Sequence, residues 1–353
     1  MSSDPLETLE FECPVPIAGT DEILLGHGSG GKLTARLIEQ TIEPALTNSI
    51  LAELDDQALL PLRGESIAFT TDSFVVTPIF FPGGDIGELA VNGTVNDLAM
   101  GGATPKYLSL ALILEEGFAI ADLQRVLASI RRAADRAGVI VVTGDTKVVG
   151  RGSADKIFIN TAGIGLPRPG TALSARRVRP GDAILLSGSI GDHGMAILTM
   201  REGLELEGRL ASDTAPLNGL VDSMLDAYLD IHAMRDPTRG GLAATLVEIS
   251  TRQRLGIEVD ESAVPVTDAV RGACELLGLD PLFVANEGKL VAFVPEAGAE
   301  MVLAAMRKHC LGRDAVRIGT VTSTHPGLVV MRTPIGGSRA LDLPFAEALP
   351  RIC

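Results

Sequence analysis

The stretch Tyr107–Thr143, YLSLALILEEGFAIADLQRVLASIRRAADRAGVIVVT, holds a helical pattern between two apolar runs. Its middle part repeats apolar residues at spacings of three and four, which gives a helix one apolar face and ends it at Gly138. These apolar positions are Ile120, Leu123, Val126, Leu127, Ile130, Ala134 and Ala137. The flanking runs Tyr107–Leu114 and Val139–Thr143 have the length and composition of strands. A strand, a helix and a strand in this order predict a mixed α/β protein.

The same alternation extends in both directions from this stretch. Further strands are expected at 66–72, 156–161, 183–187, 290–294, 317–321 and 328–332, and further helices at 195–203, 220–234, 242–252 and 267–277. The segment Leu166–Asp182, rich in proline, glycine and arginine, interrupts the pattern. We therefore predict a leader at 1–22, an N-terminal α/β domain at 23–166, a C-terminal α/β domain at 167–335, and a mobile tail at 336–353 that begins at Gly336-Gly337.

Composition limits the possible functions. The 353 residues carry a formal net charge of −15 and only 3% aromatic side chains, which argues against nucleic-acid binding and against an anionic membrane surface. The four cysteines, Cys13, Cys274, Cys310 and Cys353, form no CxxC pair. The acidic start lacks the cationic and apolar parts of a signal peptide. These features predict a cytoplasmic protein.

A glycine-rich loop, Gly26-His27-Gly28-Ser29-Gly30-Gly31-Lys32-Leu33, comes close to the phosphate-binding loop pattern. Leu33 breaks that pattern, because a phosphate loop needs Ser or Thr there to bind Mg²⁺. If this loop covers a nucleotide through Gly28, Gly30, Gly31 and Lys32, the metal must be held elsewhere. The alternative is that the loop only begins the helix that follows it.

Aspartates stand at predicted strand ends and in glycine turns, where carboxylates could meet in one cleft. They are Asp55 and Asp56, Asp72 in Thr-Thr-Asp, Asp97 in Asn-Asp-Leu-Ala-Met-Gly-Gly, and Asp145 in Thr-Gly-Asp-Thr-Lys. Mg²⁺ prefers oxygen ligands shared among carboxylates, water and phosphates, so these side chains suit Mg-ATP. Any one of them alone is better explained as a turn or cap residue, but the set favours a metal–nucleotide site.

Four other positions carry chemistry. Lys147 could neutralise phosphate charge or be a solvated strand-edge residue. Arg239, in Asp236-Pro237-Thr238-Arg239-Gly240-Gly241, could hold a phosphate or lie in an interhelical turn. Glu287, directly before an apolar run, could be a base that faces the cleft or a turn residue. Cys353 could be a tethered carrier thiol or an incidental last residue.

Taken together, eight motifs resemble those of the hydrogenase maturation family HypE. They are GHGSGGK (26–32), TTDSFVV (70–76), VNDLAM (95–100), TGDTKVV (143–149), GDHG (191–194), RDPTRGGL (235–242), VANEGK (284–289) and PRIC (350–353). The resemblance implies a PurM-like fold, similar to aminoimidazole ribonucleotide synthetase. In that fold the N-terminal domain forms a homodimer β-barrel and the C-terminal domain covers the ATP cleft.

The resemblance also implies an activity. Members of the family receive a carbamoyl group from the carbamoyltransferase HypF on a C-terminal cysteine and use ATP to dehydrate it to a thiocyanate. The cyanide then passes to the iron of a [NiFe]-hydrogenase on the HypC–HypD scaffold. By matching positions, Cys353 is the modified cysteine, Asp56, Asp72, Asp97 and Asp145 bind Mg²⁺ and ATP, and Lys147 and Glu287 handle the thiocarboxamide and its protons.

Two alternatives remain open. Selenophosphate synthetase and thiamine-monophosphate kinase are similar proteins that also place Mg-ATP on aspartates, but neither accounts for the final Pro-Arg-Ile-Cys. A non-enzymatic carrier would use Cys353 alone and would have no need of the aspartates. ATP binding that depends on Asp72 or Asp145 separates the carrier from the enzyme.

Overall fold

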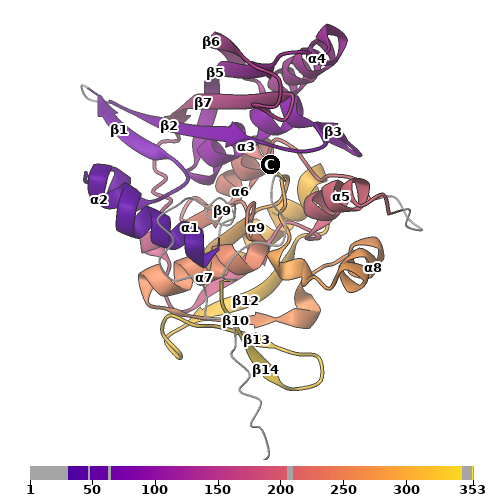
Figure 1. Ribbon diagram of the computed structural model, residues 1–353. Coiled ribbons are helices and arrows are strands. Elements are labelled where there is room, and N and C mark those ends of the chain that lie inside the picture. Colours follow the sequence, from indigo (N-terminus) through magenta and orange to yellow (C-terminus); the bar gives the residue numbers. More distant parts are fainter. Residues whose placement is uncertain (1–30, 47, 63–64, 205–209, 344–351, 353) are drawn as a thin grey trace, which may run out of the picture.

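The computed structural model describes residues 31–46, 48–62, 65–204, 210–343 and 352, and these form two α/β domains (Figure 1). The first domain is built on the sheet β1 (Ala58–Leu62), β2 (Glu65–Phe74), β5 (Ala103–Glu115), β6 (Ile140–Val149) and β7 (Ile157–Pro167), in the order β1-β2-β7-β5-β6. The short pair β3 (Phe80–Phe81) and β4 (Gly84–Asp85) lies beside it. Three helical elements precede this sheet along the chain: α1 (Lys32–Leu37), a π-helical turn (Ile38–Ile42) and α2 (Glu43–Leu46).

Two helices cover one face of this sheet, α3 (Ile86–Met100) and α4 (Ile120–Ala137). The α4 helix confirms the pattern expected from its apolar spacing: Val126 and Ile130 are buried, and Gly138 adopts the left-handed conformation (φ 70°) that ends the helix. The α3 helix begins at Asp85, whose Oδ1 accepts hydrogen bonds from the amides of Gly87 (2.8 Å) and Glu88 (3.1 Å).

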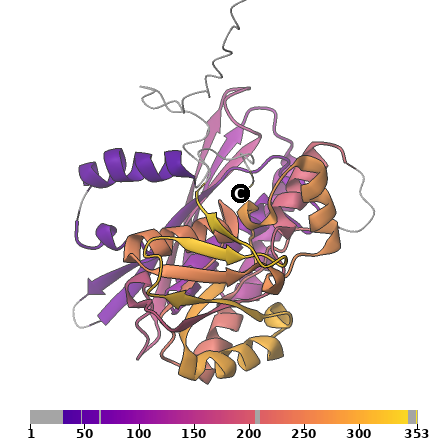
Figure 2. The same cartoon turned by 90° about the horizontal axis from the view of Figure 1, so that it is seen from below.

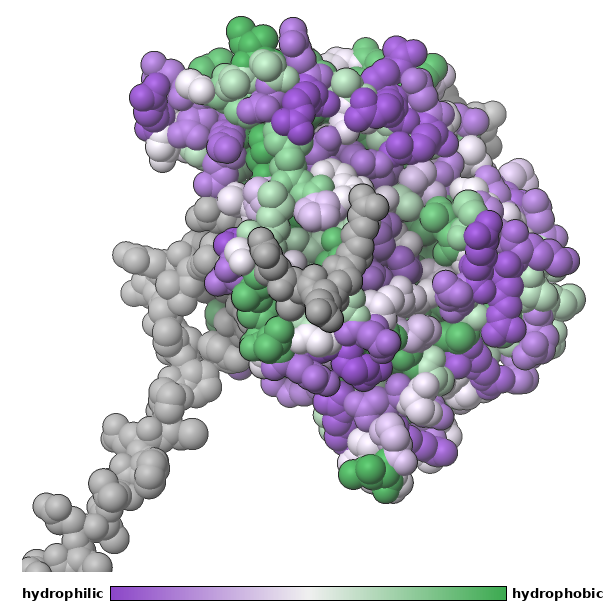
Figure 3. Space-filling view, turned by 90° about the vertical axis from the view of Figure 1, so that its right-hand side faces the viewer, coloured by the Kyte–Doolittle hydropathy of each residue, from purple (hydrophilic) through white to green (hydrophobic). Residues whose placement is uncertain are grey.

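The opposite face of this sheet is uncovered by any described residue and carries apolar side chains. In β2 and β7 alternate residues are buried, so Phe69 and Ile164, which pair across the two strands, point outward. Tyr107 of β5 pairs with Ile164 and is 48% exposed. Figure 3 shows hydrophobic surface at the upper end of this domain among mostly hydrophilic residues.

The second domain has a seven-stranded sheet with helices on both faces. Its strands are β8 (Asp182–Leu186), β9 (Ala233–Arg235), β10 (Gly256–Asp260), β11 (Val291–Pro295), β12 (Val316–Thr322), β13 (Val329–Arg332) and β14 (Ser338–Leu341), in the order β14-β13-β10-β12-β8-β11-β9. Its helices are α5 (Asp192–Arg201), α6 (Asn218–Ala227), α7 (Gly241–Gln253), α8 (Asp268–Leu277) and α9 (Glu296–Lys308). Figure 2 shows this domain from below, with the yellow strands at one side of its sheet.

The central strand β8 is buried along its whole length. Ile184 and Leu186 join the cluster that includes α7, while Ala183 and Leu185 join the cluster that includes α6 and α9. A strand covered on both faces is apolar throughout, which is why the run Ala183–Leu186 shows no polar alternation.

The domains meet along α3. The Asn96 side chain donates to the carbonyl of Ala215 (3.1 Å) and accepts from the amide of Leu217 (2.8 Å), so a residue of the first domain caps the segment that leads into α6. This contact fixes one wall of the space between the two sheets.

Three sequence predictions about secondary structure were wrong. The helix expected over 220–234 ends at Ala227, because 233–235 pairs with β11 as strand β9. Asp97 was expected in a turn but lies in α3, a helix buried all round and therefore lacking the single apolar face that marks a helix in sequence. The tail expected from Gly336 contains β14, which pairs with β13. The predicted leader, residues 1–22, lies outside the described part of the chain.

Candidate functional site

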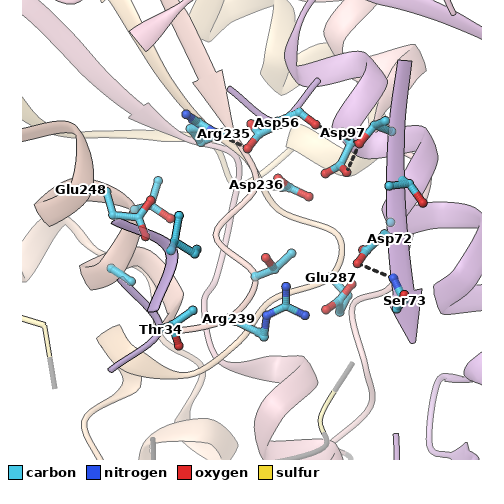
Figure 4. Close-up of a pocket in the computed structure, with 17 residues that line it drawn as sticks. Thr34, Asp56, Asp72, Ser73, Asp97, Arg235, Asp236, Arg239, Glu248 and Glu287 are labelled. Atoms are coloured by element: carbon cyan, nitrogen blue, oxygen red, sulfur yellow. Dashed lines mark hydrogen bonds and ion pairs between the residues drawn. The ribbon is translucent and has the colours of Figure 1, made fainter. Parts of the chain in front are cut away.

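A polar cavity of about 340 Å³ lies between the two domains (Figure 4). Its volume is in the range of small-molecule sites. The first domain contributes Asp56, Thr70, Asp72, Ser73, Gly93 and Asp97, and α1 with its extension contributes Thr34 and Ile38. The second domain contributes Arg235, Asp236, Thr238, Arg239, Glu248 and Glu287. Carboxylates from both domains therefore face one space.

The three aspartates of the first domain are held by neighbouring polar groups. The Thr70 hydroxyl lies 2.8 Å from Asp97 Oδ2 and 2.9 Å from the carbonyl oxygen of Asp56. The backbone amide of Ser73 donates to Asp72 Oδ1 at 2.8 Å. Through Thr70, strand β2 thus contacts two acidic residues from other parts of the domain. Asp97 lies on helix α3, which packs against the strand, and Asp56 lies on the segment before β1.

In the second domain, the end of β9 supplies one cation and one acid. Arg235 forms a salt bridge with Asp56 and donates to the carbonyl of Leu54 (3.1 Å), and so fixes the segment before β1. Asp236 follows directly and points into the cavity, as Figure 4 shows. Arg239 and Glu287 approach the same space from the two loops that follow β9 and precede β11.

The loop that carries Glu287 is rigidly attached. Asp213 accepts hydrogen bonds from the amide of Glu287 (3.0 Å) and from Lys289 Nζ (3.0 Å). Gly288 leaves no room for a side chain, because a Cβ there would lie 1.8 Å from the carbonyl oxygen of Asp213. The Glu287 side chain is 3% exposed, and its Oε1 has no hydrogen-bond partner among the described residues.

Burial and mutual repulsion raise the pKa of the acids in this cavity. Burial raises the pKa of Asp56 and Asp72, although Arg235 and Arg239 respectively oppose this. Burial, with repulsion from other aspartates, raises the pKa of Asp97 and Glu287 well above the usual range. For Asp236 the pKa rises to about 8. Such shifts are frequent at catalytic and ion-binding sites, because crowded buried carboxylates are costly until a cation or a proton compensates their charge.

The cavity suits a magnesium-bound nucleotide by the chemistry of its donors. Among the described residues no three acidic, histidine or cysteine side chains stand close enough to form a complete metal site by themselves. Mg²⁺ is ordinarily held by one or two carboxylates together with water and phosphate oxygens, so a complete protein cage is not required. Asp56, Asp72, Asp97 and Asp236 would hold the ion, and Arg239 would face the phosphates.

The structure brings together Asp56, Asp72, Asp97 and Glu287, but not the other two predicted residues. Asp145 and Lys147 lie on β6, form an ion pair with each other at 2.9 Å, and are 63% and 69% exposed as side chains. They do not line the cavity, contrary to the expectation that four aspartates meet there. The reason is that β6 is the edge strand of the sheet, three strands away from β2.

Of the predicted glycine-rich loop, Gly28 and Gly30 lie outside the described residues. Gly31 precedes α1, and its carbonyl accepts from the amide of Ala35 at 3.0 Å. Lys32 forms an ion pair with Asp342, beyond β14. Helix α1 nevertheless borders the cavity through Thr34.

Three further residues line the cavity that the sequence motifs gave no role: Arg235, Asp236 and Glu248. Asp236 stands in the motif Arg-Asp-Pro-Thr-Arg-Gly-Gly, from which only Arg239 was selected. The sequence feature that could have indicated Asp236 is an acid followed by proline, just before the two glycines at which a helix begins. This feature does not distinguish a site residue from a turn residue, since Asp-Pro also begins ordinary turns.

The chain matches two domain families over most of its length. Residues 54–166 match the N-terminal domain of the AIR synthase related proteins, and residues 179–331 match the C-terminal domain of the same proteins. The structure of AaThiL complexed with AMPPCP and TMP is 21% identical with a TM-score of 0.68, covering 89% of this chain and 96% of that one, which indicates a shared fold. Fold and cavity thus define an AIR synthase related protein with an acidic site between its two domains.

Within that class, much closer relatives exist. The carbamoyl dehydratase HypE of Azotobacter vinelandii is 54% identical over 327 residues, covering 93% of this chain and 96% of the relative. The HypE of Escherichia coli is 49% identical, covering 94% of this chain and all of the relative. A crystal structure of HypE in complex with ATP is 52% identical with a TM-score of 0.79, covering 94% of this chain and 100% of that one. The chain belongs to the HypE family of carbamoyl dehydratases.

Proposed function

We propose that this carbamoyl dehydratase converts an S-carboxamide on Cys353 into a thiocyanate at the cavity between its domains, using ATP. The observation that carries the proposal is the cluster of Asp56, Asp72, Asp97, Asp236 and Glu287 around one space, where Oε1 of Glu287 has no hydrogen-bond partner among the described residues. The structure of a relative with ATP supports the nucleotide. The HypE motif Pro-Arg-Ile-Cys supports Cys353 as the site of the group.

The reaction conserves atoms in the following way. The carboxamide oxygen attacks the γ-phosphorus of ATP, ADP leaves, and the carbon–oxygen bond then breaks to release phosphate. The nitrogen loses two protons as the carbon–nitrogen triple bond forms, so the elements of water end in phosphate and in released protons. Mg²⁺, held by the aspartates, would stabilise charge on the transferring phosphoryl group.

Glu287 suits the role of proton acceptor. Its raised pKa makes its carboxylate a stronger base than an ordinary glutamate, and its unpaired Oε1 is available to a substrate N–H. Arg239 faces the same space and would counter the negative charge of the phosphates.

We also propose two kinds of partner. A crystal structure of a HypE–HypF complex, 48% identical with a TM-score of 0.83, supports HypF as the donor of the carbamoyl group. By the family resemblance, the HypC–HypD scaffold receives the cyanide for the iron of a [NiFe]-hydrogenase, in the cytoplasm. Among the described residues no helix is both long and apolar enough to cross a membrane.

A second copy of the chain is proposed to cover the outer face of the first sheet, as the family's barrel requires. This face carries Phe69, Tyr107 and Ile164 in the open, although a monomer ordinarily leaves no large apolar patch uncovered. Asp145 and Lys147 point to this same face, because they pair with Ala111 and Ile113 of β5. These two residues lie four and six residues after Tyr107, so their side chains are on the same side of the strand as Tyr107. Their part in the reaction would then depend on the second copy.

The test is the intact mass of the protein after incubation with HypF, carbamoyl phosphate and ATP, compared between wild type and Cys353→Ala. The expected result is a carbamoyl adduct that loses the mass of one water, with neither change in the variant. An adduct that forms on Cys353 but never loses water would refute the dehydration step, and the absence of any adduct would refute the carrier role of Cys353.

A further inference from the structure

Ile352 is the described residue nearest the C-terminus, and it is held in place by both its side chain and its backbone. The side chain is 3% exposed and belongs to the apolar cluster that includes Met195, Val284 and Ala285. Its carbonyl oxygen lies 2.8 Å from Nε2 of His193. A buried side chain and a hydrogen-bonded carbonyl on the same residue mark a specific seat for Ile352.

The hydrogen-bond partners of His193 fix its tautomer. A carbonyl oxygen can only accept, so Nε2 carries the proton and donates to Ile352. Nδ1 lies 2.8 Å from the Ser212 hydroxyl, which in turn accepts from the amide of Thr214 at 3.1 Å. The hydroxyl therefore donates to Nδ1. Burial lowers the pKa of His193 and so favours the neutral ring that this arrangement needs.

Packing holds the ring in one orientation. His193 is fully buried in the first turn of α5, and its ring meets that of Phe81 edge-on, with centroids 5.6 Å apart. The imidazole thus has a fixed direction from which to donate to the tail.

The same segment is tied to the loop that carries Glu287. The amide of Gly194 donates to the carbonyl of Ala285 (3.1 Å), and the amide of Gly191 donates to the side chain of Asn286 (2.8 Å). On the other side, Asp213, the residue after Ser212, accepts from the amide of Glu287 at 3.0 Å. The group that holds the tail and the residue proposed as base therefore belong to one hydrogen-bonded frame.

We propose that His193 is the positioning residue that seats the end of the chain, by donating its Nε2–H to the carbonyl of Ile352 and so placing the next residue, Cys353, for reaction. The amide nitrogen of Cys353 is bonded to that same carbonyl carbon, so the hydrogen bond restrains the first atoms of the reacting residue. This inference rests on the proposed function for the role of Cys353, but the docking that it describes can be measured without any reaction.

The experiment uses substitutions that separate the two ring nitrogens. Glutamine at 193 can place its amide N–H near the position of Nε2 and keep the bond to Ile352, whereas asparagine reaches only the position of Nδ1. The matched variants are His193→Gln and His193→Asn in the full chain. Ile352→Ala is the third variant, because it weakens the seat and leaves the His193 side chain unchanged.

The readout is the rate at which iodoacetamide alkylates Cys353, followed on the C-terminal peptide by mass spectrometry and divided by the rate at Cys310. Cys310 is exposed and serves as the internal standard, while Cys274 is buried and reports loss of fold. We expect His193→Asn and Ile352→Ala to raise the ratio about fivefold, the scale of one net hydrogen bond or a small apolar contact. We expect His193→Gln to stay within about twofold of wild type.

The proposal is overturned if His193→Asn leaves the ratio unchanged while Cys274 remains protected, or if glutamine raises it as much as asparagine does. If either His193 variant exposes Cys274, the result for Ile352→Ala is used instead. An unchanged ratio of Cys353 to Cys310 alkylation in Ile352→Ala would show that Ile352 does not hold the end of the chain. The dehydration of a preloaded carbamoyl adduct is then measured in the same variants. Failure of wild type to dehydrate refutes the proposed function, whereas wild-type rates in His193→Asn refute positioning for reaction.

Discussion

Strands β2 and β6 carry similar sequences, Thr-Thr-Asp and Thr-Gly-Asp, in the same sheet, yet their aspartates have different surroundings. Asp72 of β2 lines the cavity, and burial raises its pKa. Asp145 of β6 lies in solvent, and hydrogen bonds from Lys147 and the amide of Thr146 lower its pKa. The difference follows from strand order and side-chain direction, neither of which a local motif contains.

The largest expected effect in this comparison is that of Asp72→Asn. Loss of a carboxylate that faces the proposed metal–nucleotide site should lower the rate of ATP-dependent dehydration by about a hundredfold or more. The same change should raise the melting temperature of the protein without nucleotide, because burial makes the charged form of Asp72 costly. A single-turnover assay and a thermal melt check the two parts. A lower melting temperature with retained activity would contradict both.

The second prediction concerns the uncovered face that Asp145 shares. Ile164→Lys places a charge on that face and should convert a dimer into monomers, since an unpaired charge in an apolar interface is strongly unfavourable. Sedimentation velocity measures the change. The matched control is Ile120→Lys on α4, which is 74% exposed and outside this sheet face. Equal sedimentation of the two variants would rule out the proposed dimer face.

The sequence predicted much of the fold because most elements have a local signature. The amphipathic face of α4 and the apolar runs of β8 and β11 are visible in the residues themselves. Helix α3 has no such face, because 13 of its 15 residues are buried on all sides. Strand β9 has only three residues and forms by pairing with β11, which is distant in the sequence. The sequence therefore predicted a helix that continues into these residues.

The candidate site was predictable in part for the same reason. The criterion of an acid next to an apolar run selected Asp56, Asp72 and Asp97, and all three line the cavity. The same criterion selected Asp145, which does not line the cavity, because its strand β6 is at the edge of the sheet. Asp236 was not selected, because its burial and its neighbours come from long-range packing between the domains.

The third prediction tests how rigidly the Glu287 loop must be held. Gly288→Ala forces a Cβ into the backbone of Asp213 and should lower the free energy of unfolding by about 1–3 kcal/mol. It should also slow dehydration, because the loop that carries Glu287 must move. Gly150→Ala is the control, since a Cβ there meets nothing within 4 Å. Chemical denaturation checks the stability, and equal midpoints for the two variants would show that the loop adapts.

The fourth prediction concerns pH. The pKa of Asp236 is raised from 3.8 to about 8, so the folded state binds its proton more tightly than the unfolded state does. Its contribution to stability is therefore fully present below about pH 4 and is lost as pH rises toward 8. Between pH 8 and pH 6, the protein without Mg²⁺ should gain on the order of 2 kcal/mol from this group.

This gain is measured by denaturation at the two pH values, in wild type and in Asp236→Asn. The variant should lack most of the difference, because its side chain does not titrate. Saturating Mg-ATP should also flatten the dependence in wild type, since a cation stabilises the charged carboxylates. An identical pH dependence in the variant would assign the effect to other groups, with Glu287 and Asp97 as the remaining candidates.

The smallest expected effect is that of Asp145→Asn in a single copy of the chain. When it is combined with Ile164→Lys, which isolates the monomer, Asp145→Asn should change the dissociation constant for ATP by less than about threefold, the range of an exposed ion pair. Isothermal titration in the Ile164→Lys background and in the otherwise wild-type protein gives the comparison. A large loss of affinity confined to the dimer would mean that Asp145 serves the cavity of the partner subunit, and a large loss in the monomer would mean that β6 reaches its own cavity after a rearrangement. Either result would show which cavity Asp145 serves, since within one copy of the chain the position of β6 at the sheet edge keeps this residue out of the cavity.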